Sequence, residues 1–294
     1  MAWYERGYEE ERRPMGGGLR GHSVVMWLIG INAAVFVLDM IFSTGMRTQA
    51  VSPSYWGNYN VADGVFGLQV WRWITYQFLH DGFFHVLFNL LAIYFFGPMI
   101  EGWLGGRRFL AFYLLCGTCG ALVYTLVVLT APGLIFPPGT PARVVPIVGA
   151  SGAVFGILVA AAVLFPTQRV MLLSPPIPMT LRTMALLFLG LAVLSLLAGS
   201  ANAGGEAAHL GGAVLGYVLI RYPRLLAWAE GVDPGTVRTS LQRRKAERAR
   251  QAVEDDEKEL DRILDKVRQH GLHSLTRGEQ RTLRRNTERK RRAG

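Results

Sequence analysis

Residues 84–103, FHVLFNLLAIYFFGPMIEGW, decide the fold class of this 294-residue chain. The run carries one acidic residue, Glu101, near its end, and a helix of about 20 mostly apolar residues is long enough to cross a bilayer. Further segments of the same kind occur at about 23–43, 109–131, 147–165, 180–199 and 206–221. The pattern predicts an all-α polytopic membrane protein, with six transmembrane helices packed as a bundle.

Charged residues are concentrated at the two ends of the chain. Residues 221–294 hold 20 of the 31 Lys and Arg and 12 of the 21 Asp and Glu, whereas the 200 positions from 21 to 220 hold seven basic and five acidic residues. Such a stretch cannot form a water-facing surface, which excludes a soluble enzyme, a fibrous protein and a disordered chain. We predict an N-terminal tail at 1–21, a membrane domain at 22–221 and a basic helical tail at 222–294.

The basic tail sets the expected orientation. Six spans place both termini on one side, and clusters of Lys and Arg beside a membrane domain mark the cytoplasmic side. We therefore expect a multi-pass protein of the plasma (inner) membrane with both termini in the cytoplasm. The tail is expected to contact anionic lipid and not nucleic acid, because it adjoins a membrane domain. The first 20 residues lack the apolar core of a cleavable signal peptide.

Polar residues open three of the predicted spans at one membrane face. With this orientation the second, fourth and sixth spans all start at the outer face and run inward. His85 and Asn89 open the second span, Ser151 opens the fourth, and His209 opens the sixth. The connection 44–83 is too polar at 44–64 to span, so we expect a folded loop that dips partly into lipid. The four polar side chains are thus expected to converge near the outer face.

Ser151 lies in the sequence Gly149-Ala150-Ser151-Gly152. A serine flanked by glycines at a loop-to-helix junction has an exposed hydroxyl, and its own N–H lacks a partner within the helix. A nucleophile with an oxyanion hole needs both features. The alternative is a helix-capping serine in a small-residue packing face, since Gly152 and Gly156 form a GxxxG step.

His209 lies within the apolar sixth span, followed by Gly212 and Gly216. An unpaired ionisable side chain buried there costs several kcal/mol, so it is a functional candidate. The two glycines allow the sixth span to approach the fourth closely enough for a hydrogen bond between His209 and Ser151. The alternative is a histidine that only bridges two helices.

His85 and Asn89 are four residues apart and share one helix face. Both can donate a hydrogen bond to a developing oxyanion, and the alternative is a polar clamp between helices. A zinc site built from His80, His85 and His209 is disfavoured, because position 89 is Asn and no acid stands where a metalloprotease motif requires one. We therefore expect no metal and no cofactor.

Two further sets of residues receive no chemical role. Cys116 and Cys119 have CxxC spacing, but they lie in an apolar run without a redox context and are expected to pack inside the third span. Asp39 and Asp81 are the acids nearest the outer face in the first half of the chain. Neither has a pattern that assigns it a role.

Taken together, residues 22–221 resemble the rhomboid family of intramembrane serine proteases. The matching motifs occur in the family's order and on the corresponding spans. They are Trp71-Arg72, His85-x-x-x-Asn89, Glu101 followed by Gly105 and Arg108, Gly149-x-Ser151-Gly152, and Ala208-His209-x-x-Gly212-x-x-x-Gly216.

The resemblance implies a catalytic dyad of Ser151 and His209 without a catalytic aspartate. It also implies an oxyanion hole formed by His85, Asn89 and the Ser151 N–H, with Phe155 packed on the histidine. Supporting roles follow for Gly149, Gly152, Gly212, Gly216, Trp71, Arg72, Glu101 and Arg108. The implied substrates are single-span membrane proteins cut near their outer end. A non-catalytic rhomboid-like protein that binds transmembrane helices is the alternative, and a transporter is disfavoured because no repeat of broken helices is seen.

The tail carries helix signals of its own. Leu260, Ile263, Leu264 and Val267 form an apolar stripe at helical spacing. Gly271 predicts a helix end, and Thr276-x-x-Glu279 predicts a capping box. Residues 262–276 resemble a short module at the C-terminus of some bacterial rhomboid proteins. A two-helix hairpin that docks on the membrane domain or on a partner, and a solvated tail held at lipid by Arg284-Arg285 and Lys290-Arg291-Arg292, both remain open.

Overall fold

The computed structural model describes residues 23–45, 52–172, 176–200, 202–230, 262–269, 271, 275–276, 278–279 and 283. The chain divides into two compact units, Met1–Glu230 and Gly231–Gly294. The predicted N-terminal tail at 1–21 and the basic residues at 284–285 and 290–292 lie outside the described residues.

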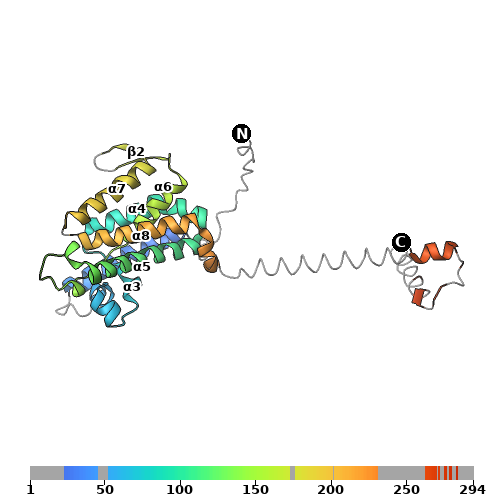
Figure 1. Cartoon of the computed structure of the whole chain (residues 1–294), viewed down its shortest axis with the longest axis horizontal. Helices are drawn as coiled ribbons and strands as arrows, with labels where there is room; N and C mark the ends of the chain where they lie inside the picture. Colours follow the sequence, from blue (N-terminus) through green and yellow to red (C-terminus); the bar gives the residue numbers. More distant parts are fainter. Residues whose placement is uncertain are drawn as a thin grey trace. The chain divides into compact units, whose positions relative to one another are not determined.

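The first unit is a helical bundle (Figure 1). Its long helices are α1 (Val24–Gly45), α4 (Phe83–Leu104), α5 (Gly106–Thr130), α6 (Ser151–Leu164), α7 (Leu181–Leu197) and α8 (Ala203–Arg221). Segments within α1 (Val24–Ser43), α4 and α5 are long and apolar enough to cross a membrane, and α6 and α7 are shorter apolar helices. The predicted helical membrane fold is confirmed, while the count of six spans stays a prediction.

The predicted fourth span is wrong over its first four residues. Residues 147–150 are not helical: Ile147 pairs with Tyr59 in a two-way backbone bridge, with N···O distances of 2.7 and 3.1 Å. Gly149 has φ +128°, a conformation that suits glycine, and its N–H donates to the Tyr76 carbonyl at 2.9 Å. The apolar run continues through this turn, but α6 begins only at Ser151.

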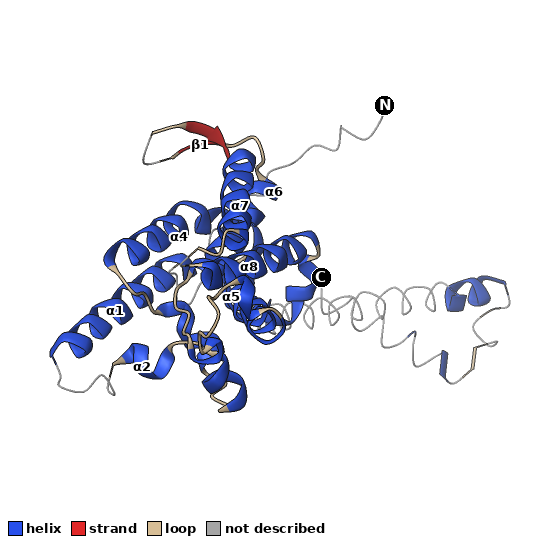
Figure 2. Ribbon diagram, turned by 60° about the vertical axis from the view of Figure 1, so that its left-hand side comes forward, coloured by secondary structure: helices blue, strands red, loops and turns tan. Residues whose placement is uncertain are grey.

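Short elements fill the connections between the long helices. The loop before α4 contains α2 (Pro53–Gly57), a π-helical turn η3 (Ala62–Phe66), α3 (Arg72–Thr75) and η4 (Tyr76–Phe78), and η5 (Pro132–Leu134) and η6 (Ala142–Val144) follow α5. An antiparallel hairpin joins α6 to α7, formed by β1 (Arg169–Met171) and β2 (Pro178–Thr180) (Figure 2). The predicted folded loop at 44–83 is therefore folded throughout its described part.

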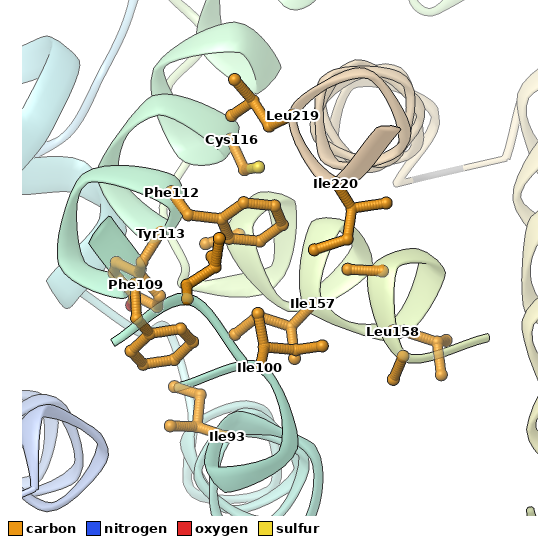
Figure 3. Close-up of a cluster of buried hydrophobic side chains, with 14 of the residues drawn as sticks. Ile93, Ile100, Phe109, Phe112, Tyr113, Cys116, Ile157, Leu158, Leu219 and Ile220 are labelled. Carbon is orange, nitrogen blue, oxygen red and sulfur yellow. The ribbon is translucent and has the colours of Figure 1, made fainter. Parts of the chain in front are cut away.

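Apolar side chains from all six long helices meet in the bundle core, and Figure 3 labels those of α4, α5, α6 and α8. The large, fully buried side chains include Ile93 and Ile100 from α4, Phe109 and Phe112 from α5, and Ile157 from α6, and Ile220 from α8 is 4% exposed. The 3₁₀ segment η7 (Pro223–Glu230) also packs on α5 and buries Leu226 completely. Residues 223–230 therefore pack with the bundle, and the predicted domain limits stay a prediction.

Glycine lets α6 and α8 touch along their backbones. A methyl group on Gly212 would overlap the Gly152 carbonyl oxygen, and one on Gly216 would lie 2.5 Å from Gly156 Cα. On the other side of α8, a methyl group on Gly120 of α5 would lie 2.7 Å from the Ala208 carbonyl oxygen. A larger residue at these positions would force the backbones apart, so α8 is held between α5 and α6 along the stretch from Ala208 to Gly216.

The described part of the second unit is a short helix at 262–269 and a capped turn. Gly271, at φ +77°, donates its N–H to the Val267 carbonyl at 2.8 Å and ends the helix. Glu279 accepts from the Thr276 N–H at 2.8 Å, and the Glu279 N–H donates to Thr276 Oγ1 at 3.3 Å. These are the reciprocal bonds of a capping box. Ile263 and Leu275 are buried beside it.

Candidate functional site

Ser151 is the first residue of α6. The turn at Gly149 delivers the chain to this position, and the helix itself supplies no acceptor for the N–H groups of its first turn. The Ser151 side chain therefore stands at a helix N-terminus, where backbone N–H groups and the helix dipole favour negative charge.

His209 meets Ser151 across the close contact between α6 and α8. The distance from His209 Nε2 to Ser151 Oγ is 2.7 Å, which joins two residues 58 positions apart in sequence. Phe155, one turn after Ser151, stacks on the imidazole with ring centroids 4.4 Å apart and planes inclined by 8°. The imidazole is thus fixed by a hydrogen bond at its edge and an aromatic ring on its face.

Glu206 contacts the opposite edge of the same imidazole. Its Oε2 lies 2.9 Å from His209 Nδ1, and Oε1 accepts from Asn202 Nδ2 at 3.2 Å. The carboxylate and the imidazole are 16% and 13% exposed. The sequence analysis gave Glu206 no role. The signal was its place three residues before His209, which puts both on one face of α8.

His85 lies near the serine, next to Gly149. A methyl group on Gly149 would lie 2.7 Å from His85 Nε2 and 3.5 Å from Ser151 Oγ, so Gly149 leaves the space into which the imidazole fits. Asp81 Oδ1 lies 2.7 Å from His85 Nδ1. Asp81, which received no role from the sequence, is thus the partner of His85 four residues later.

Asn89 is 5% exposed and donates from Nδ2 to the His85 carbonyl oxygen at 2.9 Å. This contact runs along the face of α4 that also carries His85. It places Asn89 one turn deeper than the imidazole, and the described contacts include none between Asn89 and Ser151.

The remaining motif residues hold the scaffold. Arg72 is 4% exposed and donates to the carbonyl oxygens of Asn58 and Tyr55 at 2.6 and 3.1 Å. Trp71 Nε1 donates to the Trp56 carbonyl oxygen at 3.0 Å.

At the other end of α4, the Glu101 carboxylate accepts the Val24 and Val25 N–H groups at 2.7 and 3.2 Å. A carboxylate at this place caps the start of α1. Arg108 lies half-buried in the first turn of α5. Glu101 and Arg108 therefore both lie far from Ser151, at the ends of α4 and α5 that are remote from it.

His80 is the third histidine near the site. Its ring meets that of His85 edge to face, with centroids 5.0 Å apart. Burial, and then the neighbouring His85, lower the pKa of His80 to about 4. Across the described residues, His, Cys, Asp and Glu side chains nowhere gather in threes as metal ligands. The described arrangement offers a serine, an imidazole and hydrogen-bond donors, which is the equipment for acyl transfer.

Comparisons with known proteins point to one family. A model of the Rhomboid domain matches residues 67–224, and a model of a family of unknown function (DUF6576) matches residues 247–289. The chain is 29% identical over 204 residues to RHOMBOID-like protein 12, mitochondrial, of Arabidopsis thaliana, and 35% identical over 102 residues to the putative rhomboid protease YdcA of Bacillus subtilis. It is 26% identical over 202 residues to the rhomboid protease AarA of Providencia stuartii.

These matches cover different shares of the proteins. They take in 67%, 35% and 67% of this chain, in the same order. They take in 57%, 49% and 71% of the relatives, so the chain spans about half the length of the first two.

Proposed function

The chain belongs to the rhomboid family, and from this premise we propose that it is an intramembrane serine endopeptidase. Its substrates are single-span membrane proteins, cut near the outer face of the membrane. The observation that carries the proposal is the 2.7 Å contact between Ser151 Oγ and His209 Nε2. A nucleophile and its base within hydrogen-bond reach are the geometric requirement for this chemistry.

In the proposed reaction, Ser151 Oγ attacks the substrate carbonyl carbon while its proton passes to His209 Nε2. The imidazolium then returns this proton to the leaving amine as the C–N bond breaks, which leaves an acyl-enzyme. Water attacks the acyl group with His209 again as base, and Ser151 recovers its proton. The stacked ring of Phe155 holds the imidazole in one plane through these steps.

Three groups are proposed to stabilise the oxyanion. The Ser151 N–H stands at the start of α6, and the His85 imidazole lies beside it. Because the Asp81 carboxylate can only accept, it holds a proton on His85 Nδ1, so that donation from Nε2 uses the imidazolium form. The Asn89 amide has a second N–H besides the one bound to the His85 carbonyl. Removing one such donor typically costs about 10²–10³ in kcat.

The length of α6 supports a site below the membrane surface. Its 14 residues span about 21 Å, whereas the hydrocarbon core of a bilayer is about 30 Å thick. One end of α6 therefore stops within the membrane, and the non-helical residues before it must line protein or water. A substrate helix has to unwind locally to reach Ser151, which residues that weaken helices make easier.

We also propose that the protein lies in the plasma membrane with both termini in the cytoplasm, and that the basic tail contacts anionic lipid. Cysteine variants at Arg238 and Arg143 test the orientation. A membrane-impermeant maleimide added to intact cells is expected to label position 143, in the loop before α6, and not position 238.

Cleavage of a single-span reporter by the purified full chain in proteoliposomes tests the activity. The wild type is expected to cut the reporter and to react with a fluorophosphonate at Ser151, and Ser151→Ala and His209→Ala are expected to abolish cleavage. Ser195→Ala is the matched control, because Ser195 lies in α7 and its hydroxyl forms a hydrogen bond of 2.7 Å with that of Ser200, just after the helix. Equal cleavage by all four proteins, or cleavage by none, would refute the protease and favour a helix-binding protein.

A further inference from the structure

The His209 imidazole uses both of its nitrogens. Nε2 lies 2.7 Å from Ser151 Oγ, and Nδ1 lies 2.9 Å from Glu206 Oε2. The second contact joins residues three apart on α8, so a single turn of helix fixes it. The carboxylate and the imidazole are both mostly buried. This pair lies outside the Ser–His dyad that the sequence predicts.

The acceptor character of the carboxylate decides the tautomer of His209. An ionised carboxylate has no proton to donate, so Nδ1 must carry the hydrogen of this bond. A neutral imidazole has one N–H, and Nε2 is therefore left with a lone pair directed at Ser151 Oγ. This is the form that a general base needs. Without Glu206, His209 can adopt the other tautomer, in which Nε2 carries the hydrogen and cannot accept the proton of Ser151.

We propose that Glu206 is a positioning residue that holds His209 as the base and stabilises the imidazolium, so that Ser151, His209 and Glu206 act as a triad. The inference rests on the proposed function. When Ser151 Oγ forms its bond to the substrate carbonyl carbon, its proton moves to Nε2. The resulting positive charge lies against Glu206, and Nδ1 keeps its own proton. The proton on Nε2 then leaves with the amine, and Glu206 stays ionised throughout.

Glu206 is the carboxylate that acts on the His209 imidazole, because the described neighbouring helices bring no other charged group to it. From α6 come Ser151 and Phe155, and α6 carries no acidic or basic residue. In α5, charges occur only at Arg107 and Arg108 in the first turn, whereas α8 meets α5 near Gly120.

The other packed elements add little charge. In α7 the only charged residue is Arg182, at the end remote from the start of α8. On the α4 side of Ser151, His85 is paired with Asp81. Asn202, just before α8, holds the second oxygen of Glu206.

A purely structural role for Glu206 is the competing explanation. Glu206 is in the first turn of α8, and a carboxylate at such a place stabilises its helix through the helix dipole. Loss of such a role lowers thermal stability and leaves the pH dependence of the reaction unchanged. A positioning role instead changes kcat and the acid limb of its pH profile. This limb, the fall of kcat at low pH, reports protonation of the base.

The test compares wild type, Glu206→Gln and Glu206→Asp in reporter cleavage, with kcat and KM measured across pH and thermal unfolding measured alongside. Gln keeps the size of the side chain but removes the charge, and its amide can present either oxygen or nitrogen to Nδ1. We expect Glu206→Gln to lower kcat by about a hundredfold or more with KM little changed. Its acid limb is expected to move to lower pH by about one unit or more, since the imidazolium loses its partner.

Two further variants sharpen the comparison. Glu206→Asp keeps the charge on a shorter stem, so kcat is expected to lie between the other two with the acid limb close to that of wild type; this variant also serves if the Gln variant does not fold. Glu101→Gln is the matched control, because it removes a carboxylate that caps α1 far from Ser151. It is expected to lower thermal stability and to leave the acid limb in place.

The outcomes separate the inference from the proposed function. If wild type cleaves and Glu206→Gln keeps both its kcat and its acid limb, the positioning role is refuted and the protease stands. If wild type neither cleaves the reporter nor reacts with fluorophosphonate at Ser151, the proposed function fails, and this inference fails with it.

Discussion

The His209 imidazole lies nearly parallel to the Phe155 ring, with centroids 4.4 Å apart and planes inclined by 8°. Phe155 is four residues after Ser151 on α6, so the helix that carries the proposed nucleophile also carries the aromatic ring that stacks on the proposed base. The relative position of serine and histidine is therefore fixed twice by the same two helices.

Replacement of Phe155 by Ala should slow catalysis without removing it. An aromatic pair is worth about 0.5–1.5 kcal/mol, so we expect kcat to fall by roughly 2- to 13-fold as the imidazole gains freedom. Phe155→Tyr keeps the ring and is expected to stay within about twofold of wild type. Steady-state kinetics of reporter cleavage measures both. An Ala variant as fast as wild type would show that the stack does not position His209.

Gly149→Ala is expected to abolish cleavage. The residue has φ +128°, and the added methyl group would lie 2.7 Å from His85 Nε2. Gly139→Ala is a matched control, because Gly139 also has a positive φ, +86°, but has open space where the methyl group would go. Both variants should lose about 1–2 kcal/mol of stability from backbone strain, and only Gly149→Ala should lose activity. Equal activity in the two would argue against His85 at the site.

Gly212→Ala should force α6 and α8 apart. The methyl group would overlap the Gly152 carbonyl oxygen, and overpacking of this kind typically costs about 1–3 kcal/mol. The contact between Ser151 and His209 should lengthen, so activity is expected to fall as well. Gly190→Ala in α7 meets nothing within 4 Å and should be neutral or slightly stabilising. Thermal unfolding in detergent distinguishes them, and equal melting temperatures would contradict the close packing.

Acid should open the capped turn of the tail. Glu279 accepts from the Thr276 N–H and from Lys266 Nζ, and these contacts lower its pKa to about 2. Because the folded pKa lies below the ordinary value, the stabilisation is complete above about pH 4.5 and is lost as pH falls toward 2. The protection factors for hydrogen exchange of the tail in the full chain, which correct for the pH dependence of the intrinsic exchange rate, should fall over this range.

The same opening should appear at neutral pH in Glu279→Gln. Asp265→Asn removes an exposed carboxylate from the helix at 262–269 and should leave exchange unchanged. Slow exchange that persists in Glu279→Gln at neutral pH would show that the capping box does not hold the turn.

Hydropathy located the helices well but could not find their ends. The run at 147–165 is apolar throughout, yet its first four residues form a bridge to Tyr59 and a turn at Gly149. An apolar residue can form its backbone hydrogen bonds either within a helix or in a bridge to another segment. Which of the two it forms depends on the bridging partner, here Tyr59, which is distant in sequence. The turn is the feature that brings Ser151 to the start of α6. The limit predicted for the fourth span was therefore wrong next to the site, although the flanking glycines correctly indicated a loop-to-helix junction at Ser151.

The side chains around His209 show the same limit. Ser151, His209 and Phe155 lie together in the structure. The glycines of the sixth span suggested the contact of His209 with Ser151, whereas the packing of Phe155 on the histidine was implied by the resemblance to the rhomboid family. Glu206 pairs with a histidine three residues later on the same helix, a relation that helical periodicity contains, whereas Asp81 reaches His85 from the bend just before α4. What the sequence could not supply was the direction of each side chain, since either acid could equally have faced water or lipid headgroups.

The order of the helices along the chain has a consequence for biosynthesis. Ser151 is inserted with α6, but His209 arrives only with α8, which follows every other long helix of the bundle. A ribosome-bound chain that has not yet released α8 therefore holds the proposed nucleophile without its base. Because α8 packs between α5 and α6 by close backbone contact at glycine, docking of this helix would complete the proposed pair of Ser151 and His209. A nascent chain at this stage would lack the serine–histidine pair on which the proposed cleavage depends.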